Sequence, residues 1–262
     1  MTNETVNYHD RSELSSSQVA TFLDDPIRWH YEYVSKKWAR KPATSAMQLG
    51  TLVHEMIDGG GMATLNLVVK PRDIDMRTKA GKAWADEWAE SVVVSAGTWD
   101  SLNLIWDHLQ ANTFCRTLIE IGQTEVEHIW DDDDLGACRM KADLISDGIV
   151  LDWKTTSKRS EREFTAEMVY RNYDVRLALY CRGIANLTGS RPRVFVVTIE
   201  TDGGHAVTPY EIDSEWMDDA EARLLIAVDA MRNFNLAKHL ENEPVRIYQP
   251  KWSQVNFNEM TF

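Results

Sequence analysis

Apolar residues recur along this chain with two different periods, and each period predicts one kind of secondary structure. In the first quarter of the chain they follow the spacing i, i+3, i+4, i+7, in Leu49, Leu52, Val53 and Met56. This spacing is typical of one buried face of an α-helix. Between residues 124 and 155 polar and apolar residues instead alternate one by one, which predicts strands with one buried face.

Helix-start signals support the helical segments. Serines precede the first of them, and Asp25-Pro26 separates the first from the second, as expected at helix N-termini. Helices are predicted over residues 15–23, 26–33, 47–58, the later part of 71–88, 97–121, 164–170, 174–187 and 214–238. Runs of β-branched residues predict further strands at 65–69, 91–95 and 193–200.

Two turns divide the alternating stretch into a β-meander. Residues 131–134 with Gly136 form one turn, and Asp147-Gly148 forms the other. Strands are predicted at 124–130, 136–146 and 148–155. The predicted fold class is α/β with a mixed α+β sheet: a central meander plus a further strand, flanked by helices, with helical elaborations at both ends.

One core of this size fits one domain. The chain has 262 residues, of which 44% are hydrophobic, enough for a sizeable core. We expect a single domain over residues 1–262, made of a helical N-terminal extension (1–45), a core (46–202) and a C-terminal helix with a tail (203–262).

Composition narrows the class of protein. Three widely spaced cysteines argue against a disulfide framework and against a four-cysteine metal site. The N-terminus is polar and no run of about 18 apolar residues occurs, so we expect a cytoplasmic protein without membrane contact. The net charge of −13 argues against a uniformly basic nucleic-acid surface but leaves room for a local basic channel.

The candidate chemistry lies in the meander. Val150, Asp152 and Lys154 share a strand face, and antiparallel pairing brings Asp143 close to Asp152. An Asp two residues before a Lys is often only a solvated ion pair. Here it ends an apolar strand, where charge is costly unless it is paired or bound to metal. Two carboxylates and a lysine suit Mg²⁺-assisted phosphodiester hydrolysis.

Other polar groups have simpler interpretations. The four aspartates at 131–134 lack the EF-hand pattern and predict a solvated turn. His54, on the flank of its helix, is by spacing alone more often a hydrogen-bonding residue than a ligand. The basic cluster of Arg72, Arg77, Lys79 and Lys82 fits a solvated helix face and a phosphate-contacting patch equally well.

Taken together, these residues resemble the PD-(D/E)XK nuclease superfamily, and within it the exonuclease VIII (RecE-like) 5′→3′ exodeoxyribonucleases of phages and prophages. The resemblance covers residues 14–200 and rests on several short segments that occur in the family's order. They are Leu14-Ser15-Ser16-Ser17, Leu49-Gly50-Thr51-Leu52-Val53-His54, Arg77-Thr78-Lys79-Ala80-Gly81-Lys82, the Glu125 strand, Lys141-Ala142-Asp143, Asp152-Trp153-Lys154-Thr155-Thr156 and Tyr173-Asp174-Val175-Arg176-Leu177-Ala178-Leu179-Tyr180.

The resemblance implies a metal site and its residues. Asp143 and Asp152 would ligate Mg²⁺, with Mn²⁺ as an alternative ion, and Lys154 would orient the attacking water. His54 and a strand glutamate would complete the metal site. We assign that glutamate to Glu125, and Glu127 on the same face is the alternative.

One position departs from the family. Arg176 stands where the family usually has Gln in a Gln-x-x-x-Tyr helix that ends here at Tyr180. An arginine cannot accept a hydrogen bond and adds a permanent charge. Arg176 either binds the scissile phosphate or marks a relative that does not cleave.

The function that the resemblance implies is an Mg²⁺-dependent exonuclease that degrades linear double-stranded DNA and leaves 3′ single strands for a single-strand annealing partner. We expect a homo-oligomeric ring around DNA. Candidate DNA contacts are Arg72, Arg77, Lys79, Lys82, Lys158 and Arg159. The alternatives are an endonuclease, a Cas4-like nuclease, for which the cysteine cluster is missing, and a DNA-end-binding module without catalysis.

Overall fold

The structure is a computed structural model that describes residues 8, 11–39, 45–158 and 160–241. Its centre is a five-stranded sheet in the order β3-β4-β5-β6-β7. The strands are β3 (Gln123–Asp132), β4 (Gly136–Ser146), β5 (Ile149–Thr156), β6 (Arg193–Glu200) and β7 (Val207–Ile212). The predicted meander is therefore confirmed as β3–β4–β5, and β6 is the further strand.

Only one pair of neighbouring strands in this sheet is parallel. The chain leaves β5, passes through α7 (Glu161–Tyr170) and α8 (Tyr173–Thr188), and returns as β6 parallel to β5. A crossover of two helices is what a parallel connection requires. The mixed sheet with flanking helices confirms the predicted fold class.

Strand β7 was not predicted from the sequence, and its position explains why. It contains Pro209, which cannot donate to a ladder and argues against a central strand. In the structure β7 pairs antiparallel with β6 at the edge of the sheet, where Pro209 lies opposite Val197. The sheet therefore continues to Ile212, beyond residue 202, where we expected the core to end.

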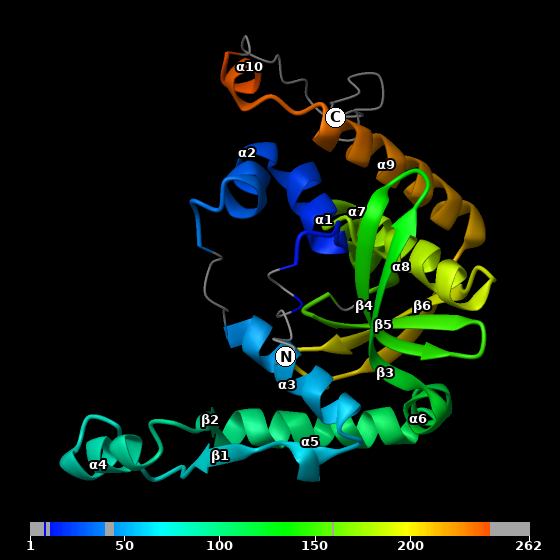
Figure 1. Cartoon of the computed structure of the whole chain (residues 1–262). Coiled ribbons are helices and arrows are strands. Elements are labelled where there is room, and N and C mark those ends of the chain that lie inside the picture. Colours follow the sequence, from blue (N-terminus) through cyan, green and yellow to red (C-terminus); the bar gives the residue numbers. More distant parts are fainter. Residues whose placement is uncertain (1–7, 9–10, 40–44, 159, 242–262) are drawn as a thin grey trace, which may run out of the picture.

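Helices cover both faces of the sheet (Figure 1). On one face α3 (Ser45–Asp58), α5 (Ala96–Ala111) and α6 (Thr113–Ile121) enclose a core that includes Val53, Ile105 and Trp153. The stripe predicted on α3 is confirmed, because Leu52, Val53 and Met56 are buried there.

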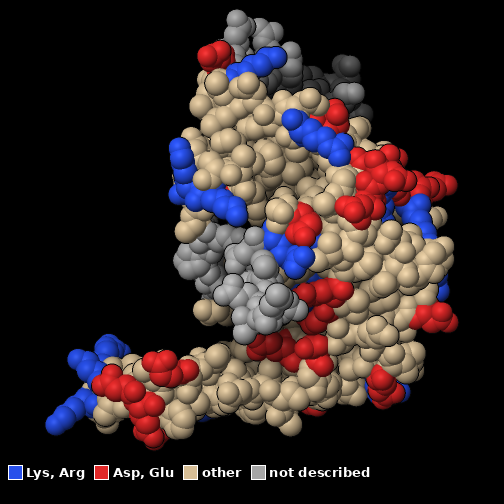
Figure 2. Space-filling model, in the orientation of Figure 1, with Lys and Arg blue, Asp and Glu red and all other residues tan. Residues whose placement is uncertain are grey.

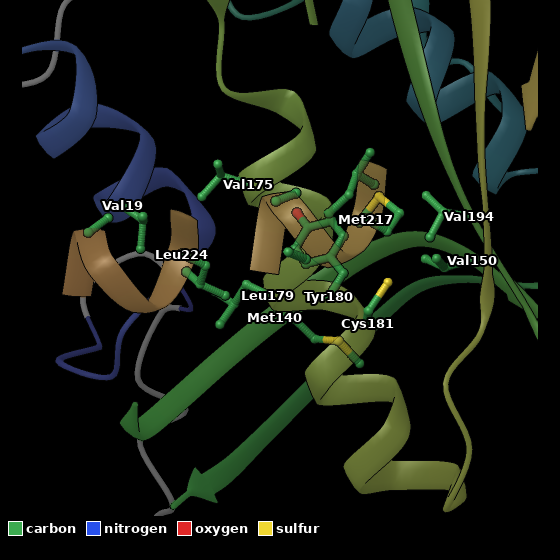
Figure 3. Packing of buried hydrophobic residues seen from close by; sticks show 14 of the residues in the cluster. Val19, Met140, Val150, Val175, Leu179, Tyr180, Cys181, Val194, Met217 and Leu224 are labelled. Carbon is green, nitrogen blue, oxygen red and sulfur yellow. The ribbon is translucent and has the colours of Figure 1, made fainter. Parts of the chain in front are cut away.

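The opposite face is covered by α1 (Ser16–Asp24), α2 (Pro26–Trp29), α7, α8 and α9 (Ser214–Arg232). Figure 3 shows how the buried side chains of α8 meet Met140 and Val150 of the sheet on one side and Leu224 of α9 on the other. Helix α8 is thus held between the sheet and α9.

Two helices differ from their predicted extents. The segment after α2 continues as a π-helical turn, His30–Val34. Helix α9 ends at Arg232 instead of residue 238, because Asn235 caps a new short helix, α10 (Leu236–Leu240), by accepting from the Lys238 amide.

The remaining elements form an arm beside the sheet (Figure 1). A 3-10 turn, Met62–Thr64, leads into β1 (Leu67–Lys70), which pairs in parallel with β2 (Val92–Ser95). Helix α4 (Lys79–Glu87) connects them at the tip of the arm. Among the described residues, no helix is long and apolar enough to cross a membrane.

Candidate active site

Strands β4 and β5 separate at the two aspartates that the sequence pattern brings together. Their ladder ends at the pair Leu144–Leu151, so Asp143 and Asp152 are the first residues beyond it. From here β4 stays paired with β3, and β5 stays paired with β6. The amide of Trp153 donates to Asp143 Oδ2 at 2.8 Å and holds that carboxylate in the opening between the strands.

His54 reaches this opening from α3. Its Nε2 lies 3.1 Å from the Trp153 carbonyl oxygen, and since a carbonyl only accepts, Nε2 carries the proton. In the neutral imidazole the lone pair is then on Nδ1, which lies 3.7 Å from Asp143 Oδ1. A ligand nitrogen whose other ring nitrogen is fixed by a backbone carbonyl is the usual arrangement at protein metal sites.

Glu125 joins these two residues through an unusual backbone conformation. Its φ of 52° places it in the left-handed region, which side chains other than glycine adopt only at a cost. Its partners in the ladder are Thr124 before it and Val126 after it, and Glu125 itself is skipped. The kink interrupts the strict alternation of β3, and Lys141 holds the Glu125 carboxylate by an ion pair of 2.6 Å.

His54, Glu125 and Asp143 form a group that fits a metal ion. One ligand atom from each lies within 4.8 Å of the others. Cis and trans ligands of an octahedral ion at about 2.1 Å are separated by roughly 3 to 4.2 Å. Glu127 is not part of this group in the described chain; it lies 3.7 Å from Lys141 instead. Of the two glutamates left open, the structure therefore places Glu125 at the site.

Asp152 contributes a buried oxygen beside the group. Its Oδ2 has no hydrogen-bond partner among the described residues, although the carboxylate forms an ion pair with Lys154. A buried carboxylate oxygen left without a hydrogen bond is costly, and a bound cation would remove that cost. The donor set, which is three carboxylates and one imidazole, fits a divalent metal.

Lys154 is fixed between acidic and aromatic groups. Its ammonium lies 3.4 Å from the Trp153 carbonyl oxygen, to which it donates, and 5.2 Å from the centre of the Tyr173 ring. Burial lowers the pKa of Lys154, but the charges of Asp152 and Asp143 outweigh burial and raise it overall. Lys154 is therefore a cation at neutral pH.

The electrostatics of Asp143 are opposite to those of a surface aspartate. Burial raises its pKa most, and the neighbouring Asp152 carboxylate raises it further, to about 6, against the opposing effects of His54 and Lys154. The two carboxylates thus repel each other without a cation. A strongly shifted acid in an opening lined by other ionisable groups is a common property of functional sites.

Helix α8 adds Arg176 and Tyr180 to the same opening. Burial lowers the pKa of Arg176, while the neighbouring Tyr180, Asp152 and Tyr173 raise it and leave it raised overall. The guanidinium lies 5.9 Å from the centre of the Tyr173 ring. Tyr180 accepts a hydrogen bond of 3.5 Å from the hydroxyl of Ser16 on α1. The predicted residues from α3, β3, β4, β5 and α8 therefore converge in one place.

The predicted DNA contacts lie elsewhere. Lys79 and Lys82 are on α4, at the tip of the arm and apart from the site (Figure 1). Arg72 pairs with Asp100, and Arg77 lies 3.4 Å from Asp75, so the arm carries both signs of charge (Figure 2).

Two further DNA-contact predictions fall near the end of β5. Lys158 is exposed just after this strand. Arg159 lies outside the described residues.

The sequence pattern did not single out every residue of the site. Lys141 and Tyr173 were quoted only as parts of longer segments, and Trp153 contributes through its backbone, which carries no sequence signal. Arg139, which lines the same opening, shares a predicted strand face with Lys141 and Asp143. That shared face was the available signal.

An acid pair on diverging strands, a lysine two residues after the second acid and a parallel strand beside it define a PD-(D/E)XK-type core. The chain belongs to the family described as PDDEXK-like domain of unknown function (DUF3799), which matches residues 15–246. The resemblance to the PD-(D/E)XK superfamily is thereby confirmed.

Solved structures agree in fold. A protein from Eubacterium rectale, named as a candidate exonuclease, is similar over 95% of this chain and 96% of its own, with 12% identity and a TM-score of 0.64. A phage-related exonuclease from Haemophilus somnus 129PT matches 72% of this chain and 94% of its own, with 12% identity and a TM-score of 0.35. No curated protein matches the chain.

Proposed function

We propose that this protein is a metal-dependent exonuclease that degrades linear double-stranded DNA from its ends. The observation that carries the proposal is the convergence of His54, Glu125 and Asp143 into one ligand group beside the Asp152–Lys154 pair. The fold and the family support the same reaction class, because PD-(D/E)XK-type cores are phosphodiester hydrolases by resemblance.

Each residue of the site has a role that its contacts support. His54, Glu125, Asp143 and Asp152 would hold the cation. A divalent ion at this position supplies positive charge for the phosphate oxygens and lowers the pKa of water. Lys154, kept cationic by its two aspartates, would orient the attacking water and stabilise negative charge on the phosphate.

Arg176 would take over part of the phosphate binding. It is a permanent cation in the opening, where the related exonucleases usually have a neutral Gln. A fixed guanidinium binds phosphate oxygens well but cannot accept a hydrogen bond from water. Lys154 is then the main candidate for positioning the water. If Arg176→Gln retained both turnover and DNA affinity, this role for Arg176 would be wrong.

The finer properties follow from the resemblance to the exonuclease VIII (RecE-like) enzymes. They are Mg²⁺ as the working ion, 5′→3′ polarity, a homo-oligomeric ring around the duplex, and 3′ single strands passed to an annealing protein in recombination.

The test is digestion of a linear duplex labelled at either its 5′ or its 3′ ends, beside a closed circular duplex, with Mg²⁺ and with EDTA. We expect metal-dependent loss of the 5′ label while the circle stays intact. Cutting of the circle would favour an endonuclease. Binding of ends without product under any metal would favour a module without catalysis.

Variants on one hairpin complete the test. Asp152→Asn removes a carboxylate of the site, and Asp147→Asn makes the same change at the exposed turn between β4 and β5. We expect Asp152→Asn to abolish digestion and Asp147→Asn to retain it. Equal activity of both variants would show that the site is assigned wrongly.

A further inference from the structure

A small pocket opens next to the metal-ligand group, on the side of α1 and α8. It has a volume of about 170 Å³, and its walls include Glu125, Asp143, Arg176 and Tyr180. Pockets for drug-sized ligands are typically about 300–1,000 Å³. A phosphate group fits the smaller space, whereas a nucleoside does not.

Arg139 lies in the wall of this pocket and is almost fully buried, with 1% of its surface exposed. Its Nε donates to the Glu13 carbonyl oxygen at 3.2 Å, and its guanidinium lies 4.5 Å from the centre of the Tyr8 ring. These contacts fix the position of the group. Its Nη1, however, is buried and has no hydrogen-bond partner among the described residues.

A buried arginine with an unused donor needs an acceptor. Leaving such a donor unpaired is unfavourable, and within the described chain Arg139 has no ion-pair partner either. Arg176, across the pocket, is likewise unpaired by any carboxylate of the described residues. Two permanent cations therefore border a space that is too small for a large ligand.

The N-terminus of α1 adds donors to the same pocket. Ser15, Ser16 and Ser17 line it; Ser15 caps the helix, which begins at Ser16. The first amides of a helix have no partner within the helix, and its dipole favours an anion at this end. Helix amides, hydroxyls and two arginines together form a typical phosphate-binding environment.

We infer that this pocket binds the 5′-terminal phosphate of a DNA strand, with Arg139 as its principal charged donor. The inference rests on the proposed nuclease function, because the adjacent Glu125 and Asp143 belong to both the pocket and the metal-ligand group. A terminal phosphate held here leaves the next phosphodiester of the same strand beside the metal site. Recognition of the end phosphate would thus select the strand end as the starting point.

The test uses hairpin duplexes with one open end that carries either a 5′-phosphate or a 5′-hydroxyl. Digestion rates are measured with Mg²⁺, and affinities are measured in EDTA so that binding is read without catalysis. We expect the phosphorylated end to be preferred by about tenfold or more, as for one hydrogen bond to a charged group. Equal rates and equal affinities for the two ends would overturn the inference.

Two variants locate the preference. Arg139→Gln removes the buried charge, and Ser17→Asp places a carboxylate at the exposed rim of the pocket, where an acidic residue at a helix N-terminus favours folding. Ser214→Asp makes the matched change at the first residue of α9, outside the pocket. We expect the ratio between the two ends to fall towards one in the first two variants and to persist in Ser214→Asp.

Other outcomes are distinguishable. A preference that persists in folded Arg139→Gln and Ser17→Asp would assign the phosphate to another site. If inorganic phosphate raises the melting temperature of the parent but the two DNA ends bind equally, the pocket takes free phosphate and the inference fails. If the protein binds phosphorylated ends preferentially in EDTA but never cleaves, the pocket is supported and the proposed nuclease function fails.

Discussion

At the scale of single residues, the site is defined by charges that the fold leaves uncompensated. Asp143 and Asp152 lie beyond the last pair of the β4–β5 ladder, and burial together with the neighbouring carboxylate raises the pKa of Asp143 to about 6. A raised pKa of an acid is a cost to the folded state at neutral pH. The protein accepts this cost where the reaction needs a cation.

The first prediction concerns Asp143→Asn in metal-free protein. The folded-state pKa of Asp143 lies above the ordinary value of 3.8, so the parent loses stability as pH rises from about 4 to about 6. The variant lacks this loss, and at pH 8 we expect its free energy of unfolding to exceed that of the parent by up to about 3 kcal/mol. Urea unfolding in EDTA at pH 4 and pH 8 measures the difference.

Addition of metal should reverse that order. Mg²⁺ at a hundred times its dissociation constant stabilises a binding protein by about 2.7 kcal/mol, and Asp143→Asn should gain little of this. Asp147→Asn, at the exposed turn, is the control and should respond as the parent does. A parent whose stability ignores divalent cations would contradict the metal site.

The second prediction uses the nitrogen ligand. His54 presents Nδ1 to the group while its Nε2 donates to Trp153, and a nitrogen ligand favours Mn²⁺ over Mg²⁺. We expect His54→Gln to weaken Mn²⁺ binding by about tenfold more than Mg²⁺ binding. Calorimetric titration of each ion gives the ratio, with His128→Gln, at an exposed position on β3, as the matched control. An unchanged ratio would remove His54 from the ligand set.

At the scale of elements, Arg182 ties the β3–β4 hairpin to the helices. From α8 it donates to Asp132 at 2.7 Å and 2.8 Å, to Asp134 at 2.6 Å and to Glu221 of α9 at 2.8 Å. Burial raises the pKa of Asp132, but hydrogen bonds from Arg182 and Trp130 lower it by more, to about 2. The hairpin that carries Glu125 and Asp143 is anchored at its far end by this network.

The third prediction follows from that anchor. Because the pKa of folded Asp132 is below its ordinary value of 3.8, its contribution of about 2 kcal/mol is present at neutral pH and is lost as pH falls from about 4 to about 2. Asp132→Asn should unfold at lower urea concentration at pH 7 and show a shallower loss in acid. Asp133→Asn, exposed in the same turn, should match the parent. Equal stabilities of all three at pH 7 would contradict the network's role.

At the scale of the whole molecule, the net charge of −13 makes the position of each cation important. The site has its own cations in Lys154, Arg176 and Arg139, whereas the arm carries Lys79 and Lys82 apart from it (Figure 1). A duplex engaged at the site would need a second positive surface to be held while it is degraded. The arm is the predicted candidate, in one subunit or across a ring.

The fourth prediction tests the arm. If Lys79 and Lys82 contact phosphates, changing both to Gln should lower the slope of log affinity against log salt concentration by about two. The metal response of the protein should not change, since neither residue lies at the site. DNA affinity measured over a salt series in EDTA gives the slope. An unchanged slope would mean that the α4 cations are only a solvated helix face.

Local patterns in the sequence determined most of the secondary structure and the identity of the principal charges. The alternation of β4 and β5 predicted that Asp143 and Asp152 meet, because side-chain direction along a strand depends only on parity. The stripe of α3 predicted a buried helix, and His54 came with it. Strand β7 escaped because Pro209 is acceptable only at an edge, and an edge is a property of the whole sheet.

Only the tertiary structure decided what each charge does. The left-handed backbone of Glu125, not strand parity, brings it rather than Glu127 to the metal-ligand group. The Trp153 backbone orients both His54 and Asp143, and backbone groups are alike in every sequence. Arg139 was one of several strand residues until the sheet, α1 and α8 enclosed it with an unused donor. Burial and the nearness of groups distant in the chain set these properties, and neither is local to any segment.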